Sequence, residues 1–254
     1  MRLRVLGCHG GESPRHRSTS FLVDDVLAID AGAITSRLSL TAQRRIRHIL
    51  ISHCHLDHVK DLAMLADNVV GDLTHPIDVV GTPGTLRMLH RHIFNDIIWP
   101  DFTRIPTPAR PVYRLKPLRK ATELRVGSYR VRGIPVSHPV ESTGFVVRNS
   151  NGAALAFSSD TGPTAALWRE VSRTPNLRVL LLEVSFPNRM QSLADRVGHL
   201  TPRTLASELR KLDRSVPVLL YHLKPPYEAT LKREVRQLKH RQLRLLKLDD
   251  TFRF

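Results

Sequence analysis

Cysteine is scarce in this 254-residue sequence, and so are long apolar runs. The two cysteines are Cys8 and Cys54, which excludes a disulfide framework and predicts two free thiols. No apolar run approaches the roughly eighteen residues that a membrane-spanning helix needs. The first residues, Met1 to Gly7, have the pattern of a strand rather than of a signal peptide, so a cytoplasmic protein without a membrane partner is expected.

Acidic residues are also few relative to basic ones. The 23 Asp and Glu face 39 Lys and Arg, giving a formal net charge of +16. Arginine and lysine are spread along the whole chain, which an arginine-rich proteome would also produce. A basic surface attracts small nucleotides and nucleic acid alike, so charge does not choose between them. The length and the 41% apolar content predict one domain over residues 1–254.

The segment His53-Cys54-His55-Leu56-Asp57-His58 directly follows the apolar run Ile49 to Ile51. Three imidazoles and a carboxylate crowded at a strand end would be costly unless a divalent cation neutralised them. Alternate residues of an extended segment point the same way, so His53 and His55 can hold one ion. Asp57 and His58 lie further along the turn and can face a second ion. Paired ions about 3.5–4 Å apart are typical of hydrolases; the alternative interpretation is a solvated, His-rich loop.

Three further candidate ligands follow apolar runs later in the chain. His138 follows the predicted strand at 129–134, Asp160 follows the run at 153–157, and His222 follows the run at 216–221. Taken singly, they could be a loop histidine, an N-cap of the helix after Pro163 and a core histidine. Their joint occurrence at strand ends favours metal binding, with the Asp160 carboxylate bridging both ions.

The chain resembles the metallo-β-lactamase superfamily and, within it, the class II 3′,5′-cyclic-nucleotide phosphodiesterases. The resemblance rests on five segments, which are His53 to His58, Ser159 to Pro163, Glu183 to Asn188, Gly198 to Pro202 and Tyr221 to Pro225. It implies an α/β fold, the four-layer αβ/βα sandwich. It places His53, His55 and His138 on one metal, Asp57, His58 and His222 on the other, and Asp160 between them. The implied cofactors are two divalent ions, zinc first, with manganese and iron as alternatives.

The implied reaction is hydrolysis of a cyclic nucleotide to a nucleoside monophosphate by a metal-bridged hydroxide. Asp57 would orient or deprotonate the attacking water. His199, which is not needed as a ligand, would donate to the phosphoryl oxygen or protonate the leaving ribose oxygen. Glu183 would hold His199 in the right tautomer, and a surface salt bridge is the equally supported alternative for this residue.

The same order of segments is similar to the RNase Z type of tRNA 3′-processing endonuclease, so RNA remains an alternative substrate. In that group the last metal histidine lies in a His-Phe-Ser context, whereas here it lies in His222-Leu223-Lys224-Pro225. A Gly-Pro-rich basic insertion for gripping tRNA is not evident. A catalytically idle binding module is disfavoured because all seven ligand positions are filled. A homodimer stays open.

Hydrophobic periodicity predicts alternating strands and helices. Strands are expected at 3–6, 20–23, 26–29, 46–51, 77–80, 129–134, 143–147, 153–157, 179–184, 216–221 and 243–248. Helices are expected at 34–40, 61–69, 85–94, 164–171, 202–212 and 228–238. The segment Trp99 to Pro117 carries five prolines and is expected to be an irregular lid or dimer contact. Its aromatic residues Trp99, Phe102 and Tyr113 favour packing in the core over base stacking.

Overall fold

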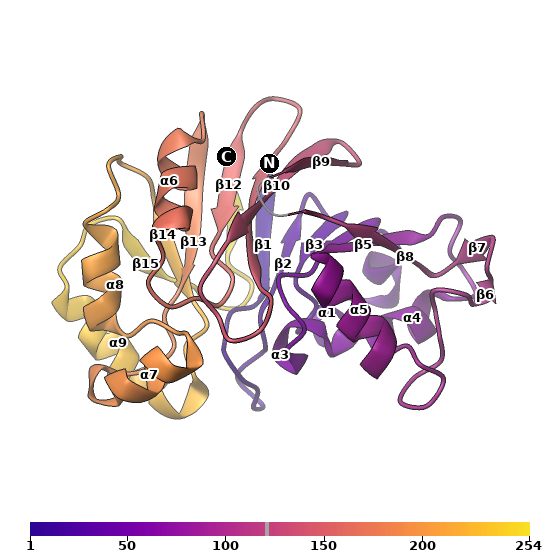
Figure 1. Cartoon of the computed structure of the whole chain (residues 1–254), viewed down its shortest axis with the longest axis horizontal. Helices are drawn as coiled ribbons and strands as arrows, with labels where there is room; N and C mark the ends of the chain where they lie inside the picture. The colour runs from indigo at the N-terminus through magenta and orange to yellow at the C-terminus, as the bar shows by residue number, and fades with distance from the viewer. Residues whose placement is uncertain (120–121) are drawn as a thin grey trace.

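Two β-sheets lie face to face in the middle of the molecule, with helices on both outer sides (Figure 1). The structure is a computed structural model that describes residues 1–119 and 122–254. In spatial order, the described strands of the first sheet are β16 (Thr251–Arg253), β1 (Arg2–Gly7), β2 (Ser20–Val23), β3 (Leu27–Ile29), β4 (His48–Leu50), β5 (Ile77–Gly81) and β8 (Tyr113–Pro117). Those of the second are β15 (Leu243–Leu245), β14 (Val218–Tyr221), β13 (Leu177–Glu183), β12 (Ala154–Phe157), β11 (Thr143–Arg148), β10 (Tyr129–Pro135) and β9 (Glu123–Val126).

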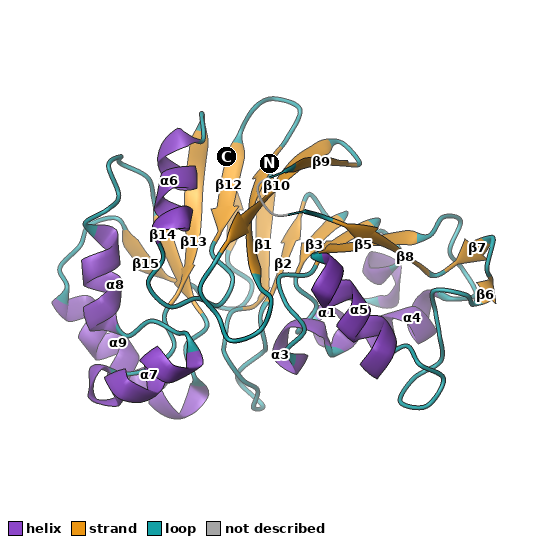
Figure 2. Ribbon diagram, viewed as in Figure 1, coloured by secondary structure: helices purple, strands orange, loops and turns teal. Residues whose placement is uncertain are grey.

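The helices divide into two sets, one for each sheet (Figure 2). Beside the first sheet are α1 (Ile34–Arg37), α2 (Leu40–Gln43), α3 (Leu56–Val59), α4 (Asp61–Val69) and α5 (Pro83–His92). Beside the second are α6 (Ala165–Arg173), α7 (Gln191–Val197), α8 (Pro202–Leu209) and α9 (Glu228–Gln237). None of the helices in the described ranges is long and apolar enough to cross a membrane.

Three buried apolar clusters separate these four layers. Neighbouring residues of a strand point to opposite faces, and in β4 Ile49 packs toward the helices of the first sheet while Leu50 packs between the sheets. In β12, Ala156 packs toward the helices of the second sheet while Phe157 packs between the sheets. Both faces of both sheets are therefore buried, and the predicted αβ/βα sandwich is confirmed.

Strand directions bring several loops to one edge of the sandwich. In the first sheet β3, β4 and β5 run parallel. In the second sheet β12, β13 and β14 run parallel, and β10 points the same way because two antiparallel pairings separate it from β12. Parallel strands end at the same edge of their sheet. The loops after β10, β12 and β14, which carry His138, Asp160 and His222, therefore leave from one edge, where β13 also ends at Glu183.

The expectation of irregular structure at 99–117 was wrong for its last part. Strand β8 pairs in parallel with β5, and β6 (Pro106–Thr107) pairs with β7 (Arg110–Pro111). Proline is tolerated here because β8 is an edge strand and Pro117 is its last residue. The predicted packing role holds for Phe102 and Tyr113, which are buried. The Tyr113 hydroxyl donates to the Leu62 carbonyl oxygen at 2.7 Å.

Other differences concern short elements. The helix expected at 34–40 is divided into α1 and α2, because Ser39 is extended and caps α2 by accepting from the Ala42 amide. Strands β9 and β16 and helix α7 were not predicted. Each presents few buried residues, so the apolar pattern that marks the other elements is weak in them.

Candidate active site

Three imidazoles from two loops converge at the edge where β4 and β10 end. His53 and His55 follow β4, and His138 follows β10. The Nε2 atom of His53 lies 3.1 Å from Nδ1 of His55, which lies 3.3 Å from Nε2 of His138. Burial, reinforced by the neighbouring His58, lowers the pKa of His53 well below its usual value. These three side chains therefore form one donor group that can hold a metal ion.

A second donor group consists of Asp57, His58, Asp160 and His222. Asp57 and His58 lie in α3, a single turn that begins right after His55. Asp160 follows β12, and His222 follows β14 with a left-handed backbone, φ 70°. The Asp160 Oδ2 atom lies 3.3 Å from Nε2 of His58 and 3.2 Å from Nε2 of His222.

Asp160 also reaches the first group, because its Oδ2 atom lies 3.8 Å from Nε2 of His53. Burial would raise the pKa of this carboxyl, but the adjacent imidazoles of His222 and His58 outweigh burial and hold the pKa well below its usual value. The carboxylate is thus ionised and lies between the two groups. The N-cap alternative is wrong, since the N-cap residue of α6 is Thr164.

Unpartnered polar atoms show that the donor set fits metal ions. Nε2 of His58, Nε2 of His222 and Oδ1 of Asp160 are buried without a hydrogen-bond partner among the described residues. Bare polar atoms in such a place are costly unless a ligand engages them. Imidazole nitrogen and carboxylate oxygen suit zinc, manganese and iron. The residues present therefore fit two divalent ions.

Three partners that orient the histidines were missed by sequence reasoning. His58 Nδ1 lies 2.7 Å from Oδ2 of Asp30, a residue at the end of β3 that is fully buried. His222 Nδ1 lies 3.0 Å from Oγ1 of Thr19, and His138 Nδ1 lies 3.0 Å from the carbonyl oxygen of Gly198. Such partners fix the ring so that the other nitrogen faces the metal. No local motif marks Thr19 or Gly198; the position of Asp30 just after an apolar run was a usable signal.

His199 and Glu183 form a buried pair beside the two donor groups. Nδ1 of His199 lies 2.8 Å from Oε1 of Glu183, and Glu183 is fully buried, so its surface alternative is excluded. Burial lowers the pKa of His199, but the Glu183 carboxylate outweighs burial, and the pKa is raised above its usual value. His199 also comes within 4.8 Å of donor atoms of His138 and Asp160. It is therefore close enough to touch either a bound substrate or an ion.

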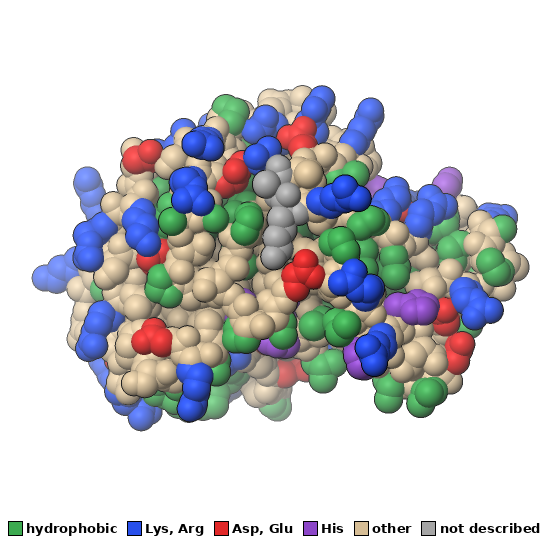
Figure 3. Space-filling view, viewed as in Figure 1, with side chains coloured by type: hydrophobic (Ala, Val, Ile, Leu, Met, Phe, Trp, Pro, Cys, Tyr) green, Lys and Arg blue, Asp and Glu red, His purple; other side chains and the backbone are tan. Residues whose placement is uncertain are grey.

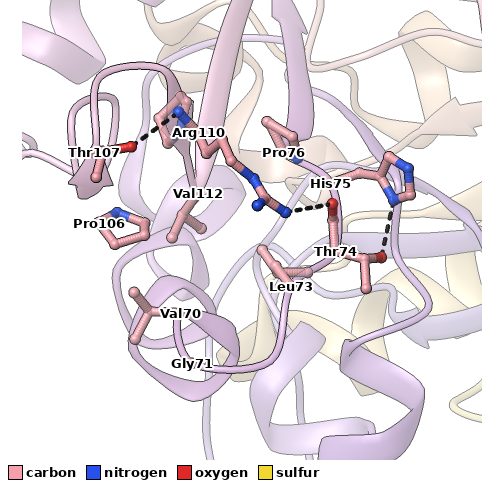
Figure 4. Close-up of a pocket in the computed structure, with 11 residues that line it drawn as sticks. Val70, Gly71, Leu73, Thr74, His75, Pro76, Pro106, Thr107, Arg110 and Val112 are labelled. Atoms are coloured by element: carbon pink, nitrogen blue, oxygen red, sulfur yellow. Dashed lines mark hydrogen bonds between the residues drawn. The ribbon is translucent and has the colours of Figure 1, made fainter.

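A separate hollow lies between the end of α4 and strands β6 and β7 (Figure 4). Arg110 crosses it and donates to the Thr74 carbonyl oxygen at 3.4 Å. The hollow lies at the start of β5, opposite the edge where β4 and β5 end. Its described lining holds one imidazole, His75, and no carboxylate. This hollow therefore takes no part in the candidate active site.

Basic side chains scatter over the face in Figure 3 and do not gather at one place.

Comparison with known proteins assigns the chain to a family. A beta-lactamase superfamily domain matches residues 19–222, and the chain belongs to this superfamily. It is 28% identical to a probable 3′,5′-cyclic-nucleotide phosphodiesterase of Yersinia pestis, over 88% of this chain and 78% of that protein. It is 29% identical to a 3′,5′-cyclic-nucleotide phosphodiesterase of Aliivibrio fischeri, over 82% and 74%.

Solved structures agree on the fold. Unliganded yeast PDE1 superposes with a TM-score of 0.81 at 19% identity, covering 98% of each chain. The short form of human tRNase Z superposes with a TM-score of 0.71 at 19% identity, covering 100% of this chain and 99% of that one. The predicted resemblance to the metallo-β-lactamase fold is confirmed.

Proposed function

We propose that the protein is a dinuclear metal-dependent phosphodiesterase that hydrolyses 3′,5′-cyclic nucleotides to nucleoside monophosphates. The observation that carries the proposal is the pair of donor groups that share the Asp160 carboxylate. A shared carboxylate fits two adjacent ions, which is the arrangement used for in-line displacement at phosphorus. The names of the two bacterial relatives support the cyclic-nucleotide substrate.

His53, His55 and His138 would hold one ion, and Asp57, His58 and His222 the other, with Asp160 between them. The chemistry that two ions supply when bound is Lewis acidity toward the phosphoryl oxygens and activation of water. We assign the ions as zinc, because His nitrogen and Asp or Glu oxygen are common zinc ligands, with manganese and iron compatible with the same donors.

The residues around the ions perform the remaining steps. Asp57 is partly exposed and its Oδ2 atom lies 3.7 Å from His222 Nε2, so it can orient the attacking water and accept its proton. As the new P–O bond forms, the bond from phosphorus to the ribose O3′ breaks. His199 protonates that oxygen through Nε2, because its Nδ1 is engaged by Glu183. Glu183 acts as a positioning residue that keeps this tautomer and the proton in place.

The test compares substrates on metal-replete protein. We expect kcat/KM for a 3′,5′-cyclic nucleotide to exceed that for a precursor tRNA, and bis-p-nitrophenyl phosphate to be cleaved as a generic diester. Asp160→Ala should abolish these activities, while the matched control His75→Ala, at an exposed histidine, should retain them. A precursor tRNA cleaved with the higher kcat/KM would replace the proposal with an RNase Z-like RNA-processing activity. The net charge of +16 is compatible with either substrate.

A further inference from the structure

A third cluster of metal-binding side chains lies outside the candidate active site. It consists of His9 and His16, from the loop between β1 and β2, and Glu228, the first residue of α9. Their donor atoms lie within 4.8 Å of one another. Glu228 lies more than two hundred positions from both histidines in the sequence, and neither the fold nor the proposed reaction requires the three residues to meet.

The spacing in this cluster fits ligands of one ion, and only one of its two histidine–carboxylate separations is a hydrogen bond, that of His16 with Glu228. Nε2 of His16 lies 3.2 Å from Oε2 of Glu228, and Nε2 of His9 lies 3.8 Å from Oε1 of the same carboxylate. The second distance is too long for a hydrogen bond. Two ligands that each lie about 2.0–2.2 Å from a tetrahedral zinc ion are roughly 3.3–3.6 Å apart. Both separations lie close to this range.

The two imidazoles are also oriented as metal ligands are. Nδ1 of His16 lies 2.5 Å from the Ser13 hydroxyl oxygen, and Nδ1 of His9 lies 3.3 Å from the carbonyl oxygen of Arg17. The loop therefore engages Nδ1 in both rings, and Nε2 faces Glu228 in both. Nδ1 of His9 also lies 3.3 Å from the Arg17 amide nitrogen. The tautomer in which Nδ1 carries the ring proton and donates it to an oxygen leaves Nε2 free to bind zinc, the usual arrangement of a zinc-binding histidine.

We propose that His9, His16 and Glu228 form a structural site for one zinc ion, distinct from the two ions of the active site. Three protein donors leave one tetrahedral position for water. The site would tie the loop between β1 and β2 to the start of α9.

The tied loop packs directly against His222. The backbone amide of His222 donates to the Cys8 carbonyl oxygen at 2.7 Å, and the amide of Gly10 donates to the Leu223 carbonyl oxygen at 3.2 Å. A Cβ atom at Gly10 would come within 2.6 Å of the His222 ring, so the loop leaves no space there. An ion at this site would therefore hold one proposed ligand of the active site in place.

Lys232 provides a test within the cluster, because its Nζ atom lies 2.7 Å from Oε1 of Glu228. This ammonium group opposes cation binding. If the cluster is only a hydrogen-bonded network, Lys232→Met loosens Glu228 and the cluster still binds no zinc. If it is a zinc site, Lys232→Met should tighten zinc binding about tenfold, since it removes one positive charge beside the ion.

The experiment measures zinc content after zinc loading and dialysis. We expect His16→Ala to hold one equivalent of zinc less per chain than both the wild type and the control His75→Ala. In a His58→Ala/Asp160→Ala background, which removes the shared carboxylate and one histidine of the second donor group, one equivalent should remain. That ion should be lost when His16→Ala is added, and Lys232→Met should lower its dissociation constant in competition with a chelating dye.

Each result tests the third zinc site separately from the proposed phosphodiesterase function. Equal zinc content in the wild type and His16→Ala overturns the third site, even if the active-site ions bind. If the His58→Ala/Asp160→Ala variant does not fold, the zinc content of His16→Ala relative to the wild type alone tests the third site. A wild type that holds only the ion removed by His16→Ala supports the third site and contradicts the dinuclear one. An unchanged dissociation constant in Lys232→Met also counts against the site.

Discussion

Glu183 is a fully buried carboxylate that bonds to the proposed general acid His199. Its carboxylate accepts from the Thr161 amide at 3.0 Å, from the Ser185 hydroxyl at 2.7 Å and from Nδ1 of His199 at 2.8 Å. Thr161 and His199 both bond to Oε1, and Ser185 bonds to Oε2. Glutamine can keep the Oε1 contacts, and the Ser185 hydroxyl can rotate to accept from the new amide. Glu183→Gln therefore removes the charge and keeps the contacts with Thr161 and His199.

Alanine at the same position would remove the acceptor of three buried donors, of which Nδ1 of His199 can still pair with the Ser185 hydroxyl oxygen 3.2 Å away. Each donor left unpaired costs about 1–3 kcal/mol, so Glu183→Ala should lower the free energy of unfolding by about 2 kcal/mol or more, as measured by urea denaturation. Glu183→Gln should lower it by less. The two variants thus separate the structural contribution of the side chain from the contribution of its charge.

The charge should appear in the pH dependence of turnover. His199 acts as an acid only while protonated, and the Glu183 carboxylate raises its pKa against the effect of burial. In Glu183→Gln the pKa of His199 falls, so the loss of kcat with rising pH should begin at lower pH than in the wild type. At neutral pH, kcat for a cyclic nucleotide should fall by a factor that approaches the 10²–10⁴ typical of a lost general acid.

The control for this measurement is Glu208→Gln. Glu208 is also a buried glutamate, and it accepts from Nε1 of Trp168 at 2.6 Å and from the Thr164 amide at 3.1 Å, neither of which belongs to the two donor groups. This variant should lose stability without moving the pH profile. An unchanged pH profile and wild-type kcat in a folded Glu183→Gln would refute the role of the pair.

Three further predictions concern the donor groups. The wild type should bind about two ions through the seven proposed ligands, and Asp160→Ala should weaken both sites together; full metal content in that variant contradicts the shared carboxylate. His199→Ala should keep the fold and both ions but lose on the order of 10²–10⁴ in kcat on a cyclic nucleotide, with a smaller loss on a p-nitrophenyl diester, whose leaving group needs no proton; loss of an ion would identify His199 as a ligand. Asp30→Asn should weaken metal affinity about 10–100-fold, measured by chelator competition, and unchanged affinity would show that Asp30 does not orient His58.

Sequence periodicity predicted most of the framework because both sheets are buried on two faces. The apolar strands and the amphipathic helices α4, α6, α8 and α9 lie within a few residues of their predicted bounds. Elements with few buried residues, such as β9 and β16, carry no such signal. Edge strand β8 was hidden by nearby prolines, which an edge position tolerates.

The sequence by itself determined the chemistry of the donors, since His53 to His58 concentrates imidazole and carboxylate within six positions. It also indicated that His138, Asp160 and His222 follow apolar runs. These residues lie close together because the strands that precede them point in the same direction and end at one edge of the sheet. Only the tertiary structure decided which groups orient those donors, because Asp30, Thr19 and the Gly198 carbonyl reach their histidines across loops. The cluster of His9, His16 and Glu228 arises in the same way: pairing between distant segments, which no local pattern encodes, brings a loop and a helix start together.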